Sequence, residues 1–241
     1  MIEIQGVSKS FNRGEVRAVD GLDLTVPNGE IFGFLGPNGA GKTTTIKLIV
    51  GLLRPDKGAI LINGLDNQKD ALKCKAMTTY VPDNPDVYER LTGLEYLNFI
   101  GDIYGVEKKQ RVERISRWLE MFEMAAAVKN PIKSYSHGMR QKIVLMAALL
   151  PEPGTIVLDE PLVGLDPRAA HFLKEAMREH CRRGGTIFFS THIMEVAERL
   201  CDRLGIIHKG RLVACGTMDE LKARSGEIES LETIFLELTE K

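Results

Sequence analysis

Residues 36–44 read GPNGAGKTT, a stretch in which Gly36 is followed after four residues by Gly41, Lys42 and Thr43. This spacing is typical of a loop whose backbone N–H groups surround phosphate oxygens. In such a loop the lysine adds positive charge for the outer phosphates, and the threonine hydroxyl is a ligand for magnesium. The stretch predicts a phosphate-binding site that consists of Gly36, Pro37, Asn38, Gly39, Ala40, Gly41, Lys42, Thr43 and Thr44.

Two adjacent carboxylates, Asp159 and Glu160, follow the apolar run 156–158. Asp159 suits a magnesium shell, and Glu160, which lies past the predicted end of the strand, can face a terminal phosphate. There it can take a proton from an attacking water, or orient that water. The alternative interpretation of the pair is a surface turn ahead of Pro161.

The apolar run 187–189 ends in Ser190, Thr191 and His192. Ligands of open α/β sheets bind at the carboxyl ends of the strands, so these residues belong to the same edge as the two acids. His192 is therefore a candidate for a hydrogen bond to a terminal phosphate. Taken alone, a histidine in this position also fits a helix cap or a structural role.

The elements that must position these residues follow from apolar periodicity. Residues 31–35 are apolar on both faces, as in a buried parallel strand, and a helix is predicted directly after the glycine loop. Short strands are also predicted at 2–7, 22–26 and 59–65, and helical periods run from about 87 to 150. Strands and helices then alternate, which predicts a parallel sheet, before a hairpin around residues 209–210 and an amphipathic terminal helix, SLETIFLELTEK.

Length and composition narrow the class of protein. A chain of 241 residues is long enough for one α/β domain with an insertion. Its 32 Lys and Arg against 33 Asp and Glu give a net charge of -1, which disfavours a dedicated nucleic-acid binder. Four cysteines without CxxC spacing indicate reduced thiols in the cytosol. No signal peptide or spanning apolar run is present in the sequence, so we expect any membrane role to act through a partner.

A series of motifs in order along the chain resembles the nucleotide-binding subunits of ABC (ATP-binding cassette) transporters. They are an aromatic residue at Phe11, GPNGAGKTT, YVP at 80–82, SHG at 136–138, LDEP, GLDP at 164–167, and STH. The resemblance covers nearly the whole chain. It implies an α/β P-loop NTPase (RecA-like) fold with a parallel-sheet core, an N-terminal antiparallel β subdomain and an inserted α-helical subdomain. We therefore expect one ABC ATPase domain over 1–241, with 1–86 and 151–241 as the core and 87–150 as the helical signature subdomain.

The resemblance also implies roles for individual residues. Phe11 would stack on adenine, Lys42 and the loop amides would hold the phosphates of ATP, and Thr43 and Asp159 would hold Mg²⁺. Glu160 would be the catalytic carboxylate, and His192 would sense the γ-phosphate. Asp166, in GLDP, would communicate between the halves of a dimer. From the residues alone, Phe11 also fits a core or turn aromatic, and Asp166 before a proline also fits a helix cap.

Residues 135–139, YSHGM, match the family's signature, usually LSGGQ, with Tyr135, His137 and Met139 substituted. In the family, the signature of one subunit closes over ATP held by the other. Ser136, His137 and Gly138 would then contact ATP in trans, at a helix N-terminus whose dipole favours an anion. The resemblance thus implies an ATP-sandwich dimer with two composite sites.

A second departure from the family concerns the residue after YVP, where Asp83 stands in place of the usual glutamine. In the family, that glutamine commonly contacts magnesium and the attacking water. A carboxylate can bind Mg²⁺ as well, with more charge and a shorter reach, and an Asx turn in DNPD is the alternative.

The predicted activity is ATP hydrolysis that drives transport through a separate permease, with the chain cytoplasmic and peripheral on the inner face of the membrane. The signature variant, Asp83 and the closing SLETIFLELTEK most resemble a bacterial exporter branch, with import as the alternative. A homodimer and a heterodimer both fit. ABC-type ATPases of repair, translation or chromosome organisation usually carry two cassettes or a coiled-coil insertion, which this sequence lacks. A P-loop kinase leaves the signature and STH unexplained.

Overall fold

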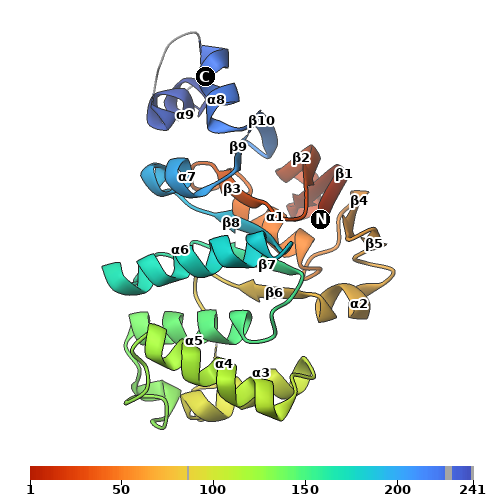
Figure 1. Cartoon of the computed structure of the whole chain (residues 1–241). Helices are drawn as coiled ribbons and strands as arrows, with labels where there is room; N and C mark the ends of the chain where they lie inside the picture. Colours follow the sequence, from red (N-terminus) through yellow and green to blue (C-terminus); the bar gives the residue numbers. More distant parts are fainter. Residues whose placement is uncertain (86, 226–229, 240–241) are drawn as a thin grey trace.

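The computed structural model describes residues 1–85, 87–225 and 230–239, which form two sheets with helices around them (Figure 1). The expected fold class is confirmed: a largely parallel sheet stands beside an antiparallel sheet made by the N-terminal strands. A group of helices lies at one end of the parallel sheet.

The antiparallel sheet has the strand order β2-β1-β4-β5. Its strands are β1 (Ile2–Phe11), β2 (Val16–Val26), β4 (Lys57–Ile62) and β5 (Leu65–Asp66). The hairpin of β1 and β2 is longer than predicted, and the 3-10 helix η1 (Asn12–Gly14) lies at its turn. Residues 59–65, predicted as one strand, divide at Asn63 and Gly64, whose φ angles are 49° and 79°. An Asn-Gly pair favours a tight hairpin turn because both residues tolerate positive φ.

The second sheet has the strand order β10-β9-β3-β8-β7-β6. Its parallel strands are β3 (Ile31–Leu35), β6 (Thr78–Val81), β7 (Thr155–Asp159), β8 (Thr186–Ser190) and β9 (Arg203–His208). β10 (Arg211–Gly216) pairs with β9 as the predicted antiparallel hairpin. The carboxyl ends of β3, β8 and β7 therefore lie side by side, and each of them leads into a predicted site motif.

Both faces of the parallel sheet are buried, as the continuous apolar runs predict. Along β7, Ile156 and Leu158 pack in one core with residues of α5 (His137–Leu149) and α6 (Pro167–Arg182). Val157, between them, belongs to the other core, with residues of α1 (Lys42–Ile49) and the antiparallel sheet. The alternation of side chains along the strand thus holds the helices on opposite faces.

The predicted helical stretch at 87–150 contains α3 (Gly93–Ile103), α4 (Lys108–Met121), the 3-10 helix η2 (Ile132–Ser134) and α5. These elements lie beyond β6 (Figure 1). The short helix α2 (Ala71–Ala76) precedes β6. The proposed division of the chain at residues 86 and 151 stays a prediction.

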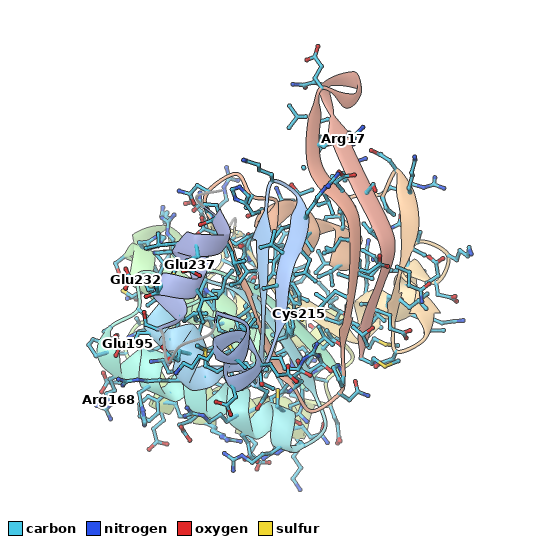
Figure 2. The ribbon with its side chains drawn as sticks, turned by 90° about the horizontal axis from the view of Figure 1, so that it is seen from above. Arg17, Arg168, Glu195, Cys215, Glu232 and Glu237 are labelled. Carbon is cyan, nitrogen blue, oxygen red and sulfur yellow. The ribbon has the colours of Figure 1, made fainter. Side chains whose placement is uncertain are left out.

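The C-terminal helices lie at the other end of the molecule (Figure 1). α7 (Met194–Leu200), α8 (Met218–Ser225) and α9 (Leu231–Thr239) share an apolar cluster with β9 and β10. The predicted terminal helix is amphipathic: Leu231, Ile234 and Phe235 are buried, and Glu232 and Glu237 are exposed (Figure 2). Residues 240–241 of that prediction lie outside the described residues. None of the helices in the described ranges has the length and hydropathy needed to cross a bilayer.

Candidate nucleotide-binding site

The glycine loop joins β3 to α1, and its backbone is held too closely for larger residues. Gly41 has a φ of 112°, and a Cβ atom there would lie 2.3 Å from the carbonyl oxygen of Ala18 in β2. A Cβ on Gly36 would lie 2.5 Å from the carbonyl oxygen of Ile207 in β9. Both distances are far inside van der Waals contact. Glycine is therefore required at these two positions, and the loop is wedged between strands of the two sheets.

Lys42 is the first residue of α1 and is buried, with 9% of its surface exposed. Its ammonium donates hydrogen bonds to the carbonyl oxygens of Gly36 (2.6 Å) and Pro37 (3.3 Å), so the side chain folds back over the loop. Burial lowers the pKa of Lys42, and the carboxylates of Glu160 and Asp159 oppose that shift. A partly desolvated ammonium lined up with a glycine loop is suited to a strongly anionic ligand.

Asp159, at the end of β7, is joined to the glycine loop by a hydrogen bond from Thr43. The Thr43 hydroxyl donates to Asp159 Oδ2 at 2.9 Å, and the Ser190 hydroxyl, at the end of β8, donates to Oδ1. A hydroxyl and a buried carboxylate this close together are oxygen ligands of the kind that Mg²⁺ takes at phosphate sites. The residues present thus fit the predicted metal.

Glu160 adopts a backbone conformation that few non-glycine residues adopt. Its φ is 49°, a conformation that costs about 1–3 kcal/mol for such a residue. Its N–H donates to the Ser190 carbonyl oxygen (3.2 Å) and hydroxyl oxygen (3.1 Å). The carboxylate Oε2 lies 3.0 Å from His192 Nδ1 and accepts a hydrogen bond from the His192 N–H at 3.3 Å. The strand end therefore turns Glu160 out of the sheet and toward His192.

One cleft collects the predicted residues from four parts of the chain. Gly36, Pro37 and Asn38 line it together with Asp83, Glu160, Thr191 and His192. The apolar lining of the cleft was not among the predicted site residues and consists of Leu35, Val163, Met194 and Phe235. Phe235 comes from α9, 75 residues after Glu160 (235 − 160), and in the sequence it looks like any apolar position of an amphipathic helix. No local signal marks it as a site residue.

Phe11 does not line this cleft. It ends β1 on the hairpin that projects from the body of the molecule, where Arg17 is labelled in Figure 2. The ring is 37% exposed, and the ammonium of Lys9 lies 5.8 Å from its centroid. The hairpin strand β2 reaches the glycine loop at Ala18, so an exposed aromatic ring is present on the hairpin that contacts the loop.

The signature residues begin α5 and lie outside the cleft. Ser136 is the N-cap residue, and its hydroxyl accepts a hydrogen bond from the Met139 N–H at 3.3 Å. Tyr135, which replaces the usual leucine, is buried and donates its hydroxyl to the Ala127 carbonyl oxygen at 2.9 Å. Ser136 and His137 are exposed at the helix N-terminus. The substitution at 135 therefore affects packing, and the exposed cap presents N–H groups outward.

Asp166 is the N-cap residue of α6, as one of the two interpretations of the sequence expects. Its Oδ1 accepts from the Ala169 N–H at 2.9 Å, and Pro167 occupies the first helical position. Its Oδ2 lies 2.6 Å from the ammonium of Lys142 in α5. This hydrogen bond with Lys142 is the main reason why the pKa of Asp166 is lowered.

A glycine loop between a buried strand and a helix, with an acid pair at the end of a neighbouring strand, defines a P-loop nucleoside triphosphatase. Residues 19–163 match the family described as "ABC transporter". The ABC-type transporter ATP-binding protein EcsA of Bacillus subtilis (strain 168) is 36% identical over 242 residues, which cover 100% of this chain and 97% of EcsA. The chain belongs to the ABC transporter family and is an ATP-binding, ATP-hydrolysing subunit.

Other relatives and solved structures agree with this assignment. The daunorubicin resistance ATP-binding protein DrrA3 of Streptomyces coeruleorubidus is 36% identical, covering 93% of this chain and 71% of DrrA3. A solved ATP-binding subunit of an ABC transporter superimposes with a TM-score of 0.95 at 36% identity, over 99% of both chains. The dimeric cassette MJ0796 bound to ADP and Pi superimposes with a TM-score of 0.82 at 22% identity, covering 90% of this chain and 99% of MJ0796, and shares the fold.

Proposed function

We propose that two copies of this chain, or this chain and a relative, bind two ATP molecules between them, and that hydrolysis drives export through a separate permease. The observation that carries the proposal is the division of the predicted residues. Lys42, Asp159, Glu160 and His192 gather at the carboxyl ends of the parallel strands, whereas Ser136 caps α5 outside that cleft. An exposed helix N-terminus is suited to an anion held by another molecule.

The chain's own residues divide the work of hydrolysis. The glycine loop and Lys42 would bind the phosphates and offset their charge, and Glu160 would take the proton of the attacking water. Thr43 and Asp159 would hold Mg²⁺, with Asp83 as a further ligand, and the ion would supply positive charge to the transferring phosphoryl group. In the free chain His192 lies against Glu160, so contact of His192 with a terminal phosphate would also alter the position of the carboxylate.

The direct test uses the catalytic carboxylate and the signature. Glu160→Gln should abolish ATP turnover and leave ATP binding intact, so ATP should convert this variant from monomer to dimer in size-exclusion chromatography with light scattering. Adding Ser136→Arg should prevent that dimer, because the added side chain fills the space of the partner's phosphate. Full ATPase activity in Glu160→Gln, or an ATP-dependent dimer in the double variant, would contradict the proposal.

The permease would dock on a second cleft, formed by α1, α2, β6 and α3. It is lined by Ile49, Val50, Leu52, Asn67, Ala71, Leu72, Cys74, Lys75, Ala76, Thr78, Tyr80, Ile103 and Tyr104. Leu52, Leu72 and Ile103 are 58%, 85% and 61% exposed, which is an unusual gathering of open apolar side chains. The transporter family assignment supports an apolar cytoplasmic segment of a permease as the occupant, near the segment that carries Asp83.

Leu72→Asp should remove co-purification with the permease from detergent-solubilised membranes and leave ATPase activity of the isolated chain unchanged. Val112→Asp is the matched control, since Val112 in α4 is 60% exposed and outside the cleft. Equal co-purification of both variants would contradict the docking site. An absence of any membrane partner for the unmodified chain would favour an ABC-type ATPase that works without a permease.

Export is supported by relatives whose names refer to drug resistance, such as DrrA3. A neighbouring gene that encodes a protein with six predicted membrane spans would support this direction. A neighbouring gene for a periplasmic binding protein would favour import instead.

A further inference from the structure

The N-terminal half of α5 is fastened to the segment 160–166 of the same chain by three separate contacts. Lys142 and Asp166 form an ion pair of 2.6 Å in which the lysine side chain is only 13% exposed. Gln141, with 1% of its surface exposed, donates its amide to the carbonyl oxygen of Pro161, the residue after Glu160, at 3.3 Å. A buried glutamine and a largely buried lysine are thus both directed to one loop.

The third contact joins two glycines. A Cβ atom on Gly138 would lie 2.6 Å from the carbonyl oxygen of Gly164, and a Cβ atom on Gly164, whose φ is 78°, would lie 2.7 Å from Cδ2 of the His137 ring. The first turn of α5 and the loop therefore meet with no space for another side chain. Gly138 is required by a contact within its own chain, independently of any contact with ATP.

We propose that Lys142 is a positioning residue, which holds Asp166 so that the signature residues 136–138 and the catalytic carboxylate Glu160 move as one unit. The inference rests on the proposed dimer, in which Ser136 and Glu160 of one chain act on two different ATP molecules. Closure of the signature over one ATP then sets the position of Glu160 at the other. The two composite sites are coupled through residues of a single chain.

Lys142 carries this coupling because its contact is charged and short, and because the lysine side chain is largely buried beside an Asp166 side chain that is 46% exposed. Charge-assisted hydrogen bonds are stronger and more directional than neutral ones, and this one ties the N-cap of α6 to α5. The Gln141 contact is neutral and 3.3 Å long, so we expect it to be the weaker link. Without Lys142, the loop would keep its cap hydrogen bond to Ala169 and lose its charged link to α5.

The test measures ATPase rate against ATP concentration for the full chain and for Lys142→Met. The wild type should be cooperative, with a Hill coefficient near 2, and the variant should fall to about 1 because its sites no longer communicate. Its kcat should fall about tenfold because Glu160 is less well placed. ATP affinity at protein concentrations that keep the chain monomeric should stay within about twofold, because Lys142 pairs with Asp166 and does not line the cleft beside the glycine loop.

Arg114→Met is the matched control. Arg114 of α4 and Glu152 form an ion pair that is also 2.6 Å long, with side chains 22% and 42% exposed. Arg114 also donates a hydrogen bond to the Leu150 carbonyl oxygen at 2.9 Å, so within the described part of the chain these polar contacts of Arg114 lie outside the segment 160–166. Arg114→Met should lower the melting temperature by about as much as Lys142→Met does, and it should leave the Hill coefficient and kcat unchanged. Lys142→Arg, which keeps the charge, should restore cooperativity.

Asp166→Asn provides a second route to the same result, because asparagine keeps the helix cap and loses the charge. It should reproduce Lys142→Met, and the double variant should be no worse than either single one. If Lys142→Met or Asp166→Asn kept the same Hill coefficient as Arg114→Met, the inference would be overturned and the proposed dimer would stand. A wild type with a Hill coefficient of 1 and no ATP-dependent dimer would overturn the proposed dimer and the inference with it.

Discussion

At the scale of single residues, Ser190 connects Asp159, the proposed metal ligand, to Glu160, the proposed catalytic carboxylate. Its hydroxyl donates to Asp159 and accepts from the Glu160 N–H at 3.1 Å, and its side chain is fully buried. Ser190 itself is assigned no contact with the metal or with the attacking water. It orders the two carboxylates relative to each other.

Ser190→Ala should therefore lower kcat for ATP by about tenfold or more, since the buried Asp159 carboxylate loses one donor and the Glu160 N–H keeps only the carbonyl oxygen of residue 190 as its acceptor. Thr186→Val, at the other end of β8, is the control. Thr186 is equally buried and bonds to Asn28 and Pro27, so its loss should lower stability without changing kcat. Matching kcat values for the two variants in steady-state assays would show that Ser190 has no role in the site.

At the scale of elements, α9 completes the cleft that holds Glu160 and His192. Phe235 packs in one cluster with Leu35, which directly precedes the glycine loop, and against Met194, which begins the helix after His192. The helix thus supports two of the segments that the site depends on. Its register places Phe235 toward the cleft and Ile234 toward the core behind it.

Phe235→Ala and Ile234→Ala should each destabilise the fold by about 2–5 kcal/mol, measured as the free energy of unfolding in urea. Only Phe235→Ala should also lower kcat, by about tenfold, because only this side chain borders the site. A loss of activity that follows stability equally in the two variants would mean that α9 only stabilises the fold.

At the scale of the whole molecule, the buried charge of Lys42 lowers the stability of the nucleotide-free fold. Burial lowers the pKa of Lys42 below its unfolded value of 10.5. The charged ammonium therefore destabilises the folded state at pH values below the folded pKa, and this penalty is lost as pH rises from the folded pKa to 10.5. At pH 7 the penalty is fully present. A ligand that supplies negative charge offsets it.

Lys42→Met should therefore unfold at a temperature equal to or above that of the wild type when ATP is absent. ATP with magnesium at 100 times its Kd should stabilise the wild type by about 2.7 kcal/mol and leave the variant unchanged. Thermal unfolding with and without ATP measures both effects. A variant that ATP stabilises as strongly as the wild type would exclude Lys42 from the binding site.

Sequence alone determined the features that depend on neighbours in the chain. The glycine loop is such a feature, because the spacing of Gly36 and Gly41 suits a strand-to-helix turn. The helix start at residues 136–138, the Asp166 cap and the amphipathic terminal helix are others. These features follow from local backbone geometry, so the types and spacing of neighbouring residues are enough to predict them. The Asn63-Gly64 turn was equally local, and reading residues 59–65 as one strand missed it.

Tertiary structure decided which distant residues meet. The order β3-β8-β7 brings Ser190 to Asp159 and Glu160, and the packing of α5 on the loop brings Lys142 to Asp166. Nothing in periodicity distinguishes Lys142 from a solvated lysine, or Phe235 from an ordinary core position. Strand order and helix packing depend on burial summed over the whole chain, and a local pattern records which face is apolar without recording what covers it.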